Sequence, residues 1–572
     1  MTQNAVYEKI KSFLKESELD GVLIARSDSF LGEYYPPYAT RLQTVTGGFS
    51  GSAGLALITP TQDILFVDSR YTVQAKAQTD FQVYEVPSET TPSAFLKKEM
   101  AGKKIGFNPW THSVTWFLKM SEILAESQVK LVGLDNRTVI DWFGDDDFVQ
   151  TDVFSYDVQY AGLSADAKKQ AIANRLKAQN LDALIMMSPE NVSWLLNLRA
   201  KTVPEYPVVF QRGVVDTSGC YEPLTETSIQ NLKGKRVALD LTQTPLAVYE
   251  RLMNVCEIKN LPDMINEMKA VKNQTERENI RQACLSESKT ICRFLAWVEE
   301  YKNQIDEMQC DNKLKCLRKE DPLYFADSFE TIAAVGEHAA RAHYRAEIVS
   351  NLPLKSAPLL LVDTGGHYLN GTTDMTRTIA IGQPTDIMKK RYTQVLQGHI
   401  DLADSSIQAG QSTGELDDKA HAWLRADGVD YYHGTSHGIG MMLAVHEMPP
   451  VVHPKDIYGL QAGMVFSNEP AFYDEKEGYG IRLETMLMAV SDSNEMRFDE
   501  TCSDNERSDE TKNQCGRVHN QKAKEEAERL VFENLLLIPF DYRLVDFSLL
   551  TVRQKQWLSA YHQRIETQIL PQ

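Results

Sequence analysis

Residues 360–378 read LLVDTGGHYLNGTTDMTRT, and this stretch decides the fold of the C-terminal half of the chain. An apolar run ends at Asp363, the chain turns through glycines and an Asn-Gly pair, and a threonine-rich run returns past Asp374. Two such runs joined by Asn-Gly are typical of a β-hairpin. We therefore expect both carboxylates to lie on one side of a sheet. Taken alone, either aspartate is explained better as a turn former or cap than as a metal ligand.

A second pair of segments repeats this pattern further along the chain. Residues 465–470 (VFSNEP) contain Glu469, residues 478–484 (GYGIRLE) end at Glu484, and we expect the two segments to pair as a hairpin. Arg482 and Glu484 are two residues apart, so on one strand they point to the same face. An ordinary cross-strand ion pair is the plainer alternative. Because Glu484 has apolar neighbours, however, an unpaired carboxylate there is costly to bury.

Histidines gather in and around a glycine-rich segment, residues 432–440 (YHGTSHGIG), which contains His433 and His437. Its three glycines disfavour a helix and let the backbone approach another group closely. His343 lies upstream of this segment and His446 downstream. A single histidine is more often an ordinary polar residue, and only the clustering favours a functional site.

Five side chains of the metal-ligand type thus stand at the ends of strand-like segments: Asp363, Asp374, His437, Glu469 and Glu484. One imidazole and four carboxylates suit two hard divalent cations. Four carboxylates brought together repel each other by about 4 kcal/mol per pair at an effective dielectric near 20, and cations remove this cost. Two metals about 3.5 to 4 Å apart hold a hydroxide at neutral pH. The pattern indicates a two-metal hydrolase.

The bulk composition narrows the class of protein further. The chain has 572 residues, a net charge of −19 and a pI near 5.2. Nucleic-acid binding needs a basic face, so we expect no such partner. No apolar run is long enough for a membrane span, and the N-terminus has the charges of an amphipathic helix rather than a signal peptide. The eight cysteines form no C-x-x-C motif, which favours reduced thiols in a cytoplasmic protein.

The first 260 residues show a faint internal repeat. A predicted helix at 6–15 precedes a strand at 19–24, and a predicted helix at 171–178 precedes a strand at 181–186. The repeat favours two related α/β domains, although any two helix–strand units look alike. Residues 203–234 give no assignment. A long helix around 280–295 opens the last region, and strands are expected at 358–362, 376–380, 464–467 and 481–490.

Residues 500–529 differ from the rest of the chain. They carry almost no large apolar residues and alternate acidic, basic, Asn and Ser side chains. Such a segment buries too little surface to offset its ordering entropy, so an exposed polar insertion is expected there.

The motifs resemble the aminopeptidase P branch of the creatinase, prolidase and methionine aminopeptidase group, and the resemblance runs nearly the whole chain. Besides the site segments, the similar stretches are GFSGSAG at 48–54, DSRY at 68–71, WLLNLR at 194–199 and QWLSAYH at 556–562. The resemblance implies an α/β (α+β) protein with two creatinase-N-like α/β domains followed by a pita-bread catalytic domain. The expected bounds are 1–155, 156–265 (a shortened second domain) and 266–572, the last with a C-terminal tail.

The resemblance also implies a role for each site residue. The five ligand-type residues match the ligands of a dinuclear centre, in which Asp374 and Glu484 bridge the metals and Glu469 also shuttles the proton of the bridging hydroxide. His343, His433 and His446 match the catalytic histidines, of which His343 and His446 line the substrate site. Arg482 matches a supporting arginine, and Arg70 is expected to reach the substrate from the first domain.

The implied enzyme is a homodimeric metallo-aminopeptidase that attacks the Xaa-Pro amide with a metal-bridging hydroxide. It releases the N-terminal residue from peptides with proline second, most often with manganese, although cobalt and zinc also suit such sites. A tertiary Xaa-Pro amide lacks an N–H and has restricted geometry, which makes a dedicated site reasonable. An Xaa-Pro dipeptidase with the same ligands and a catalytically inactive peptide-binding homologue are the alternatives. Asn370, Arg345 and Met448 depart from the family pattern, and the last two lie where they can reshape the substrate pocket.

Overall fold

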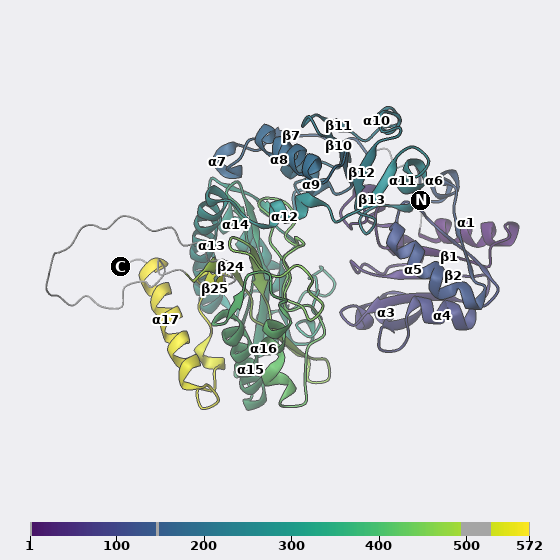
Figure 1. The fold of residues 1–572 in the computed structure, drawn as a ribbon. Coiled ribbons are helices and arrows are strands. Elements are labelled where there is room, and N and C mark those ends of the chain that lie inside the picture. Colours follow the sequence, from purple (N-terminus) through teal and green to yellow (C-terminus); the bar gives the residue numbers. More distant parts are fainter. Residues whose placement is uncertain (1–2, 145–147, 493–527, 571–572) are drawn as a thin grey trace, which may run out of the picture.

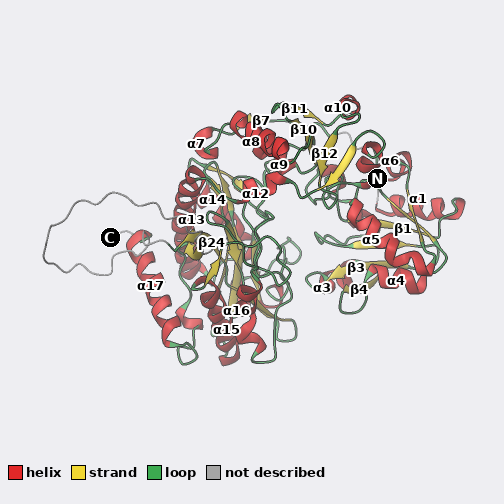
Figure 2. Cartoon of the chain, in the orientation of Figure 1, coloured by secondary structure: helices red, strands yellow, loops and turns green. Residues whose placement is uncertain are grey.

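The computed structural model describes residues 3–144, 148–492 and 528–570, and within them it forms two sheet-centred N-terminal units and a larger C-terminal unit (Figures 1 and 2). Most of the insertion predicted at 500–529 lies outside the described residues. Its last residue, Arg529, already begins a strand of the C-terminal unit. The described residues contain no helix that is both long and apolar enough to cross a membrane.

The first unit is built on a six-stranded sheet in the order β4-β3-β2-β1-β5-β6. Its strands are β1 (Gly21–Ala25), β2 (Leu55–Ile58), β3 (Asp63–Asp68), β4 (Gln82–Val86), β5 (Lys104–Phe107) and β6 (Lys130–Gly133). Its helices are α1 (Gln3–Glu16), α2 (Arg41–Thr46), α3 (Thr72–Gln78), α4 (Pro92–Glu99), α5 (Val114–Leu124) and α6 (Asn136–Phe143). The four central residues of β3 are all buried, as expected for a strand that is covered on both faces.

The second unit repeats this topology with one strand fewer, in the order β11-β10-β8-β12-β13. Its sheet strands are β8 (Ala183–Met186), β10 (Gly213–Asp216), β11 (Tyr221–Pro223), β12 (Arg236–Leu239) and β13 (Glu257–Asn260), and β7 (Val153–Ser155) pairs separately with β9 (Leu198–Ala200). Its helices are α7 (Val158–Ala161), α8 (Ala165–Ala178), α9 (Pro189–Leu196), α10 (Glu226–Asn231) and α11 (Leu246–Leu252). The unassigned residues 203–234 therefore supply two strands and a helix.

The two sheets share more than strand order. In each, the strand that follows the first long helix pairs antiparallel with the next sheet strand and parallel with a later one: β1 with β2 and β5, and β8 with β10 and β12. This common pairing favours the predicted duplication over a chance likeness. The domain bounds stay a prediction: β7 ends at residue 155 but pairs within the second unit, and residue 265 lies inside α12 (Met264–Ala270).

The C-terminal unit packs long helices against short antiparallel sheets. The helices are α13 (Gln274–Tyr301), α14 (Glu307–Arg318), α15 (Asp386–Ala403), α16 (Gly414–Arg425) and α17 (Val552–Gln568). The strands are β14 (Tyr324–Asp327), β15 (Ile332–Val335), β16 (Leu359–Thr364), β17 (Gly366–Tyr368), β18 (Gly371–Thr372), β19 (Met375–Ala380), β20 (Ser406–Gln408), β21 (Val465–Asn468), β22 (Ala471–Asp474), β23 (Tyr479–Arg482), β24 (Thr485–Ser491) and β25 (Arg529–Asn534).

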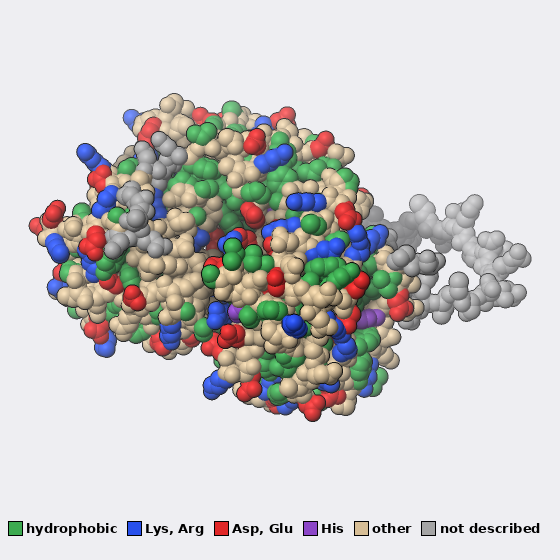
Figure 3. Space-filling model, turned by 180° about the vertical axis from the view of Figure 1, so that it is seen from behind, with side chains coloured by type: hydrophobic (Ala, Val, Ile, Leu, Met, Phe, Trp, Pro, Cys, Tyr) green, Lys and Arg blue, Asp and Glu red, His purple; other side chains and the backbone are tan. Residues whose placement is uncertain are grey.

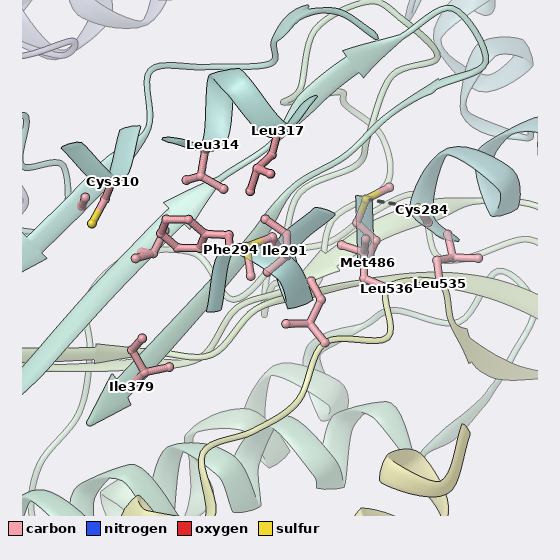
Figure 4. Packing of buried hydrophobic residues seen from close by; sticks show 14 of the residues in the cluster. Cys284, Ile291, Phe294, Cys310, Leu314, Leu317, Ile379, Met486, Leu535 and Leu536 are labelled. Carbon is pink, nitrogen blue, oxygen red and sulfur yellow. Dashed lines mark hydrogen bonds between the residues drawn. The ribbon is translucent and has the colours of Figure 1, made fainter. Parts of the chain in front are cut away.

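Helix α13 packs an apolar face against the sheets that carry the site. Its buried residues Ile280, Cys284, Ile291 and Phe294 recur at helical spacing and form one apolar face, as predicted. This face packs into a cluster with Met486 of β24 and the segment after β25, and the Cys284 sulfur lies 3.9 Å from the Met486 sulfur (Figure 4). A continuous core thus runs beneath the strands that carry the site.

One predicted hairpin is confirmed and the other is wrong. Strands β16 and β19 pair antiparallel over their full length, with Asp363 opposite Thr376. Strand β21, however, pairs with β24, while β22 pairs with β23. The single strand predicted at 481–490 is therefore two strands, and Glu484 lies in the break between them, where the chain passes from one sheet to the other.

Candidate metal centre

The five ligand-type side chains come from five separate elements of the C-terminal unit. Asp363 is near the end of β16, Asp374 lies between β18 and β19, His437 stands in the glycine-rich loop, Glu469 follows β21, and Glu484 lies between β23 and β24. A side chain at the end of a strand, or between two strands, is not restricted to one face of a sheet. Residues from different sheets can therefore point toward the same place.

The side chains meet closely. Nε2 of His437 lies 3.3 Å from a carboxylate oxygen of Asp374 and 3.5 Å from one of Glu469. Asp374, His437 and Glu484 each offer a ligand atom within 4.8 Å of the others. Ligand atoms this near to one another, from residues up to 110 apart in sequence, form a group that can hold a metal ion.

Thr376 and Arg482 connect Glu484 to Asp363, the remaining carboxylate of the set. The Thr376 hydroxyl donates to Glu484 at 2.7 Å and accepts from Nε of Arg482 at 3.2 Å. Arg482 also donates to one oxygen of Asp363, while the other oxygen of Asp363 is buried and has no hydrogen-bond partner among the described residues. Arg482 and Glu484 therefore face the same place, although the single strand predicted for them does not exist.

The site carries an excess of negative charge in a buried place. Burial and then the neighbouring Asp374 raise the pKa of Glu484, and burial raises the pKa of Glu469 to about 7. Burial also raises the pKa of Asp363, against the opposing charge of Arg482. For His437, burial favours the neutral ring, but the hydrogen bond to Asp374 and the charge of Glu469 raise its pKa to about 9. The cluster takes up protons because it lacks positive charge.

These features fit two divalent cations. A metal ion supplies the missing positive charge, and the unpartnered oxygen of Asp363 provides a free ligand atom. The orientation of His437 fits as well: Nδ1 donates to the Gly438 carbonyl at 2.9 Å, so Nε2, which faces the carboxylates, is the nitrogen that would bind a cation in place of its proton. The Ser467 hydroxyl accepts the backbone N–H of His437 at 2.9 Å and donates to Glu469 at 3.1 Å.

The three other predicted histidines surround this cluster in different ways. The His446 ring packs edge-on against His437 at a centroid distance of 4.3 Å. Both nitrogens of His433 are engaged, Nδ1 with the Gly434 carbonyl at 2.8 Å and Nε2 with the Tyr473 hydroxyl at 3.0 Å. Nδ1 of His343 lies 2.6 Å from the Tyr71 hydroxyl of the first unit. Burial lowers the pKa of His343 and of His433 to about 3, so both rings are neutral at physiological pH.

Arg70 lies beside this group rather than within the metal cluster. Its guanidinium makes a two-point pair with Asp68, at 2.8 Å and 2.7 Å, and its charge contributes to lowering the pKa of His343, His433 and His446.

Sequence reasoning missed four residues that hold the site. Thr376 and Tyr473 bind Arg482, Tyr71 binds His343, and Arg377 donates to the Glu484 carbonyl at 2.6 Å. Only Thr376 carried a signal, because it stands two residues after Asp374 in the threonine-rich run. Tyr71 and Arg377 act through partners 272 and 107 residues away, and Tyr473 acts through Arg482 on the neighbouring strand, nine residues away.

A cavity of about 250 Å³ adjoins His446. Parts of all three units line it, including Tyr34, Glu190, Lys269 and Met448. Seen from behind, the molecule is hollowed between its lobes, and charged side chains of both signs lie around the hollow (Figure 3). Of the two departures expected to reshape the substrate pocket, Met448 lines the cavity, while Arg345 pairs with Glu330.

Comparisons with known proteins agree with this arrangement. Residues 278–490 match the model of metallopeptidase family M24, and residues 528–572 match the C-terminal region of that family. Residues 7–142 and 147–221 each match a creatinase/prolidase N-terminal domain.

Relatives that are similar along nearly the whole chain are named Xaa-Pro aminopeptidases. A probable Xaa-Pro aminopeptidase P from Laccaria bicolor is 29% identical, over 98% of this chain and 90% of the relative. Xaa-Pro aminopeptidase 1 from Dictyostelium discoideum is 26% identical, over 99% and 92%. The crystal structure of an X-prolyl aminopeptidase from Caenorhabditis elegans, described as cytosolic with a di-nuclear active site, superposes with a TM-score of 0.87 at 26% identity, covering 100% of this chain and 96% of that one.

The residues of the cluster all lie within the M24 match, which follows the two creatinase/prolidase N-terminal domains in the sequence. The structural relative shares this pita-bread fold. The chain therefore matches metallopeptidase family M24 over its catalytic region and is similar along its full length to Xaa-Pro aminopeptidases.

Proposed function

We propose that this chain is an aminopeptidase that removes the N-terminal residue from peptides with proline in the second position. The convergence of four carboxylates and one imidazole at a single buried place carries the proposal. The names of the full-length relatives support the substrate class.

The proposed metal ligands are Asp363, Asp374, His437, Glu469 and Glu484, of which Asp374 and Glu484 would be available to both ions of a pair. A pair of divalent cations, when bound, supplies a water nucleophile of lowered pKa and a Lewis acid for the scissile carbonyl. We propose manganese as the physiological metal, since carboxylate-rich sites suit hard cations, with cobalt or zinc as substitutes.

Glu469 is the proposed proton carrier. Its carboxylate lies 3.5 Å from Nε2 of His437 and receives a hydrogen bond from Ser467, so it is held at the edge of the cluster. It takes a proton from the attacking water and passes it to the prolyl nitrogen, which leaves as a secondary amine. A base within hydrogen-bond reach of both atoms is what this transfer needs.

The histidines and Arg482 are proposed to stabilise the oxyanion, hold the ligands in place and contact the substrate. His446 has no hydrogen-bond partner among the described residues and faces the cavity, so its ring is available to donate to the developing oxyanion. His433 is held by two hydrogen bonds and shapes the wall beside Glu469. Arg482 fixes Asp363 and Tyr473, and His343 and Arg70 are the proposed substrate contacts of the outer wall.

The cavity beyond His446 favours an aminopeptidase over an Xaa-Pro dipeptidase. Its volume of about 250 Å³ leaves room for residues that follow proline, and its walls carry both aromatic and charged side chains. A dipeptidase has no residues to place there. The full-length similarity to Xaa-Pro aminopeptidases points the same way.

A homodimer in the cytoplasm is part of the proposal. Exposed apolar side chains at the start of the C-terminal tail, Phe547, Leu549 and Val552, provide surface for self-association. The structural relative is described as cytosolic. Sedimentation of the purified protein tests the assembly.

A peptide panel tests the proposed function. Dipeptides, tripeptides and longer peptides, with proline or alanine second, are assayed with manganese, cobalt or zinc. We expect turnover only with proline second and at least as fast for longer peptides as for Xaa-Pro dipeptides. Cleavage restricted to dipeptides makes the chain a dipeptidase. A protein that neither binds manganese nor gains activity from it is an inactive peptide-binding homologue.

A further inference from the structure

The first unit contains two motifs, residues 48–54 (GFSGSAG) and residues 68–71 (DSRY). Apart from Arg70, none of their residues has a role in the proposed function. They meet at Tyr71, the last residue of the second motif. The Tyr71 hydroxyl lies 2.6 Å from Ser52 of the first motif and 2.6 Å from Nδ1 of His343 in the C-terminal unit.

Tyr71 is held in one orientation. Its side chain is only 1% exposed, its ring packs edge-on against Phe49, and it meets the His343 ring at 89°. Gly51 makes this packing possible, because a Cβ there would come within 2.9 Å of the Tyr71 ring and 2.2 Å of the Phe49 ring. The first motif therefore fixes the hydroxyl that reaches His343.

The hydrogen bonds continue to a carboxylate. Ser52 is hydrogen-bonded to Glu33. Burial raises the pKa of that carboxyl group, while the charge of Arg26, the Ser52 hydrogen bond and the charge of Arg70 act in the opposite direction, toward the ionised form. A carboxylate only accepts, so Ser52 donates its one hydrogen to Glu33 and accepts from Tyr71. Tyr71 has then given its hydrogen to Ser52, and its oxygen accepts from Nδ1–H of His343.

This chain of donors decides which nitrogen of His343 carries the proton. The ring is neutral, since burial lowers the pKa of His343 to about 3, so a hydrogen on Nδ1 leaves Nε2 bare. Nε2 then accepts hydrogen bonds from N–H or O–H groups of a bound peptide and does not donate to its carbonyl oxygens.

We propose that Glu33, Ser52 and Tyr71 of the first unit form a hydrogen-bond relay that positions His343 and fixes it as an acceptor toward the substrate. Tyr71 is a positioning residue. Because it belongs to the first unit, His343 has this partner only when the first unit is packed against the C-terminal unit. This inference rests on the proposed peptidase function for its kinetic test, but not for its spectroscopic one.

The kinetic test compares Tyr71→Phe with Tyr84→Phe in the manganese-loaded protein. Tyr84 belongs to the same unit, and its hydroxyl binds only Gln82 at an exposed position. Losing the partner of a metal-ligating histidine costs about 10- to 100-fold, and we take the same range for His343. We expect kcat of Tyr71→Phe to fall by this factor with KM and metal content unchanged, and Tyr84→Phe to match the wild type. A kcat equal to that of Tyr84→Phe, or a loss explained by missing metal, overturns the proposal.

The spectroscopic test needs no turnover. Nitrogen-15 spectra of histidine-labelled, zinc-loaded protein, with His343 assigned through His343→Gln, report which ring nitrogen is protonated. We expect Nδ1–H in the wild type and a change of tautomer population in both Tyr71→Phe and Ser52→Ala. Ser52→Ala also serves if Tyr71→Phe folds poorly. A wild-type ring protonated at Nε2, or spectra unchanged in Ser52→Ala, contradicts the relay. A wild type that cleaves no Xaa-Pro peptide but keeps the Nδ1–H tautomer refutes the proposed function alone.

Discussion

The two N-terminal units share a strand order but contact the catalytic unit in different ways. The first unit reaches a side chain of the site, His343, through the hydroxyl of Tyr71. In the second unit, Arg199, just before the end of β9, donates instead to the backbone carbonyls of Met441 and Met442. These carbonyls belong to the loop between His437 and His446, so both contacts end at the site.

The difference lies in how much charge each contact buries. Arg199 is 1% exposed and stacks over Tyr156 at 4.1 Å, and Lys168 beside it is 2% exposed. In the first unit, Arg70 keeps about a third of its side chain exposed. A buried cation must keep every partner, whereas a half-exposed one loses little when a partner is removed. The second unit is thus a rigid support, and the first unit is suited to adjusting the chemistry.

The largest expected effect comes from Arg199→Met. Removing the guanidinium leaves buried carbonyls of Met441 and Met442 without partners, at a cost of about 3 kcal/mol in the free energy of unfolding. Activity should fall as well, because the loop carries His446. Urea unfolding and hydrogen exchange of residues 438–448 measure both effects. Arg175→Met, which removes a half-exposed arginine of the same unit, is the control. If the two variants unfold and exchange alike, the second unit is not a support.

Metal removal should affect the catalytic unit and leave both N-terminal sheets alone. Manganese at 100 times its dissociation constant stabilises the protein by about 2.7 kcal/mol, and a chelator removes this. Hydrogen exchange should therefore speed up in residues 278–490 and stay unchanged in the β1–β6 sheet. Asp374→Ala should abolish the response, while Glu533→Gln, which alters a carboxylate paired with Arg281, should keep it. A response that persists in Asp374→Ala contradicts the proposed ligand set.

Raising the pH should stabilise the second unit through Lys168. Burial lowers the pKa of Lys168 to about 7, below its ordinary value of 10.5. Between these values the unfolded chain binds a proton that the folded one lacks, so stability rises with pH by up to about 1.4 kcal/mol per unit; below pH 7 both states are protonated and the slope vanishes. Urea midpoints for the second unit at pH 7.0 and 8.5 measure it. Lys168→Met should lose the slope, and Lys169→Met, next to it but paired with exposed Asp166, should retain it.

Local sequence was sufficient for elements whose partners lie nearby. The hairpin around Asn370-Gly371 formed as predicted, and α13 buries the apolar face that its spacing indicated. The pairing of 465–470 with 478–484 failed because β22 intervenes and takes β23 as its partner, which leaves β24 for β21. Each of these short strands is suited to several partners, and only the packed core selects among them.

The ligand-type residues were recognisable because a carboxylate at the end of a buried strand is costly without a reason. The residues that position the site had no such signal. Tyr71 and His343 are 272 residues apart, and Arg199 and Met441 are 242 apart. A tyrosine after Asp-Ser-Arg and an arginine after Asn-Leu have ordinary local roles, and their partners exist only once the three units have docked.

The smallest expected effect separates Arg70 from its neighbour Tyr71. Arg70 is paired with Asp68 and partly exposed, so its contribution to substrate binding should not exceed about 1 kcal/mol, or roughly fivefold in KM. We expect Arg70→Met to raise KM by this factor with kcat close to the wild type, whereas Tyr71→Phe changes kcat alone. Initial rates over a range of Xaa-Pro-Ala concentrations, with Arg137→Met as an exposed control, measure the split. If Arg70→Met lowers kcat instead, Arg70 acts together with the relay, and both Arg70 and Tyr71 serve to position His343.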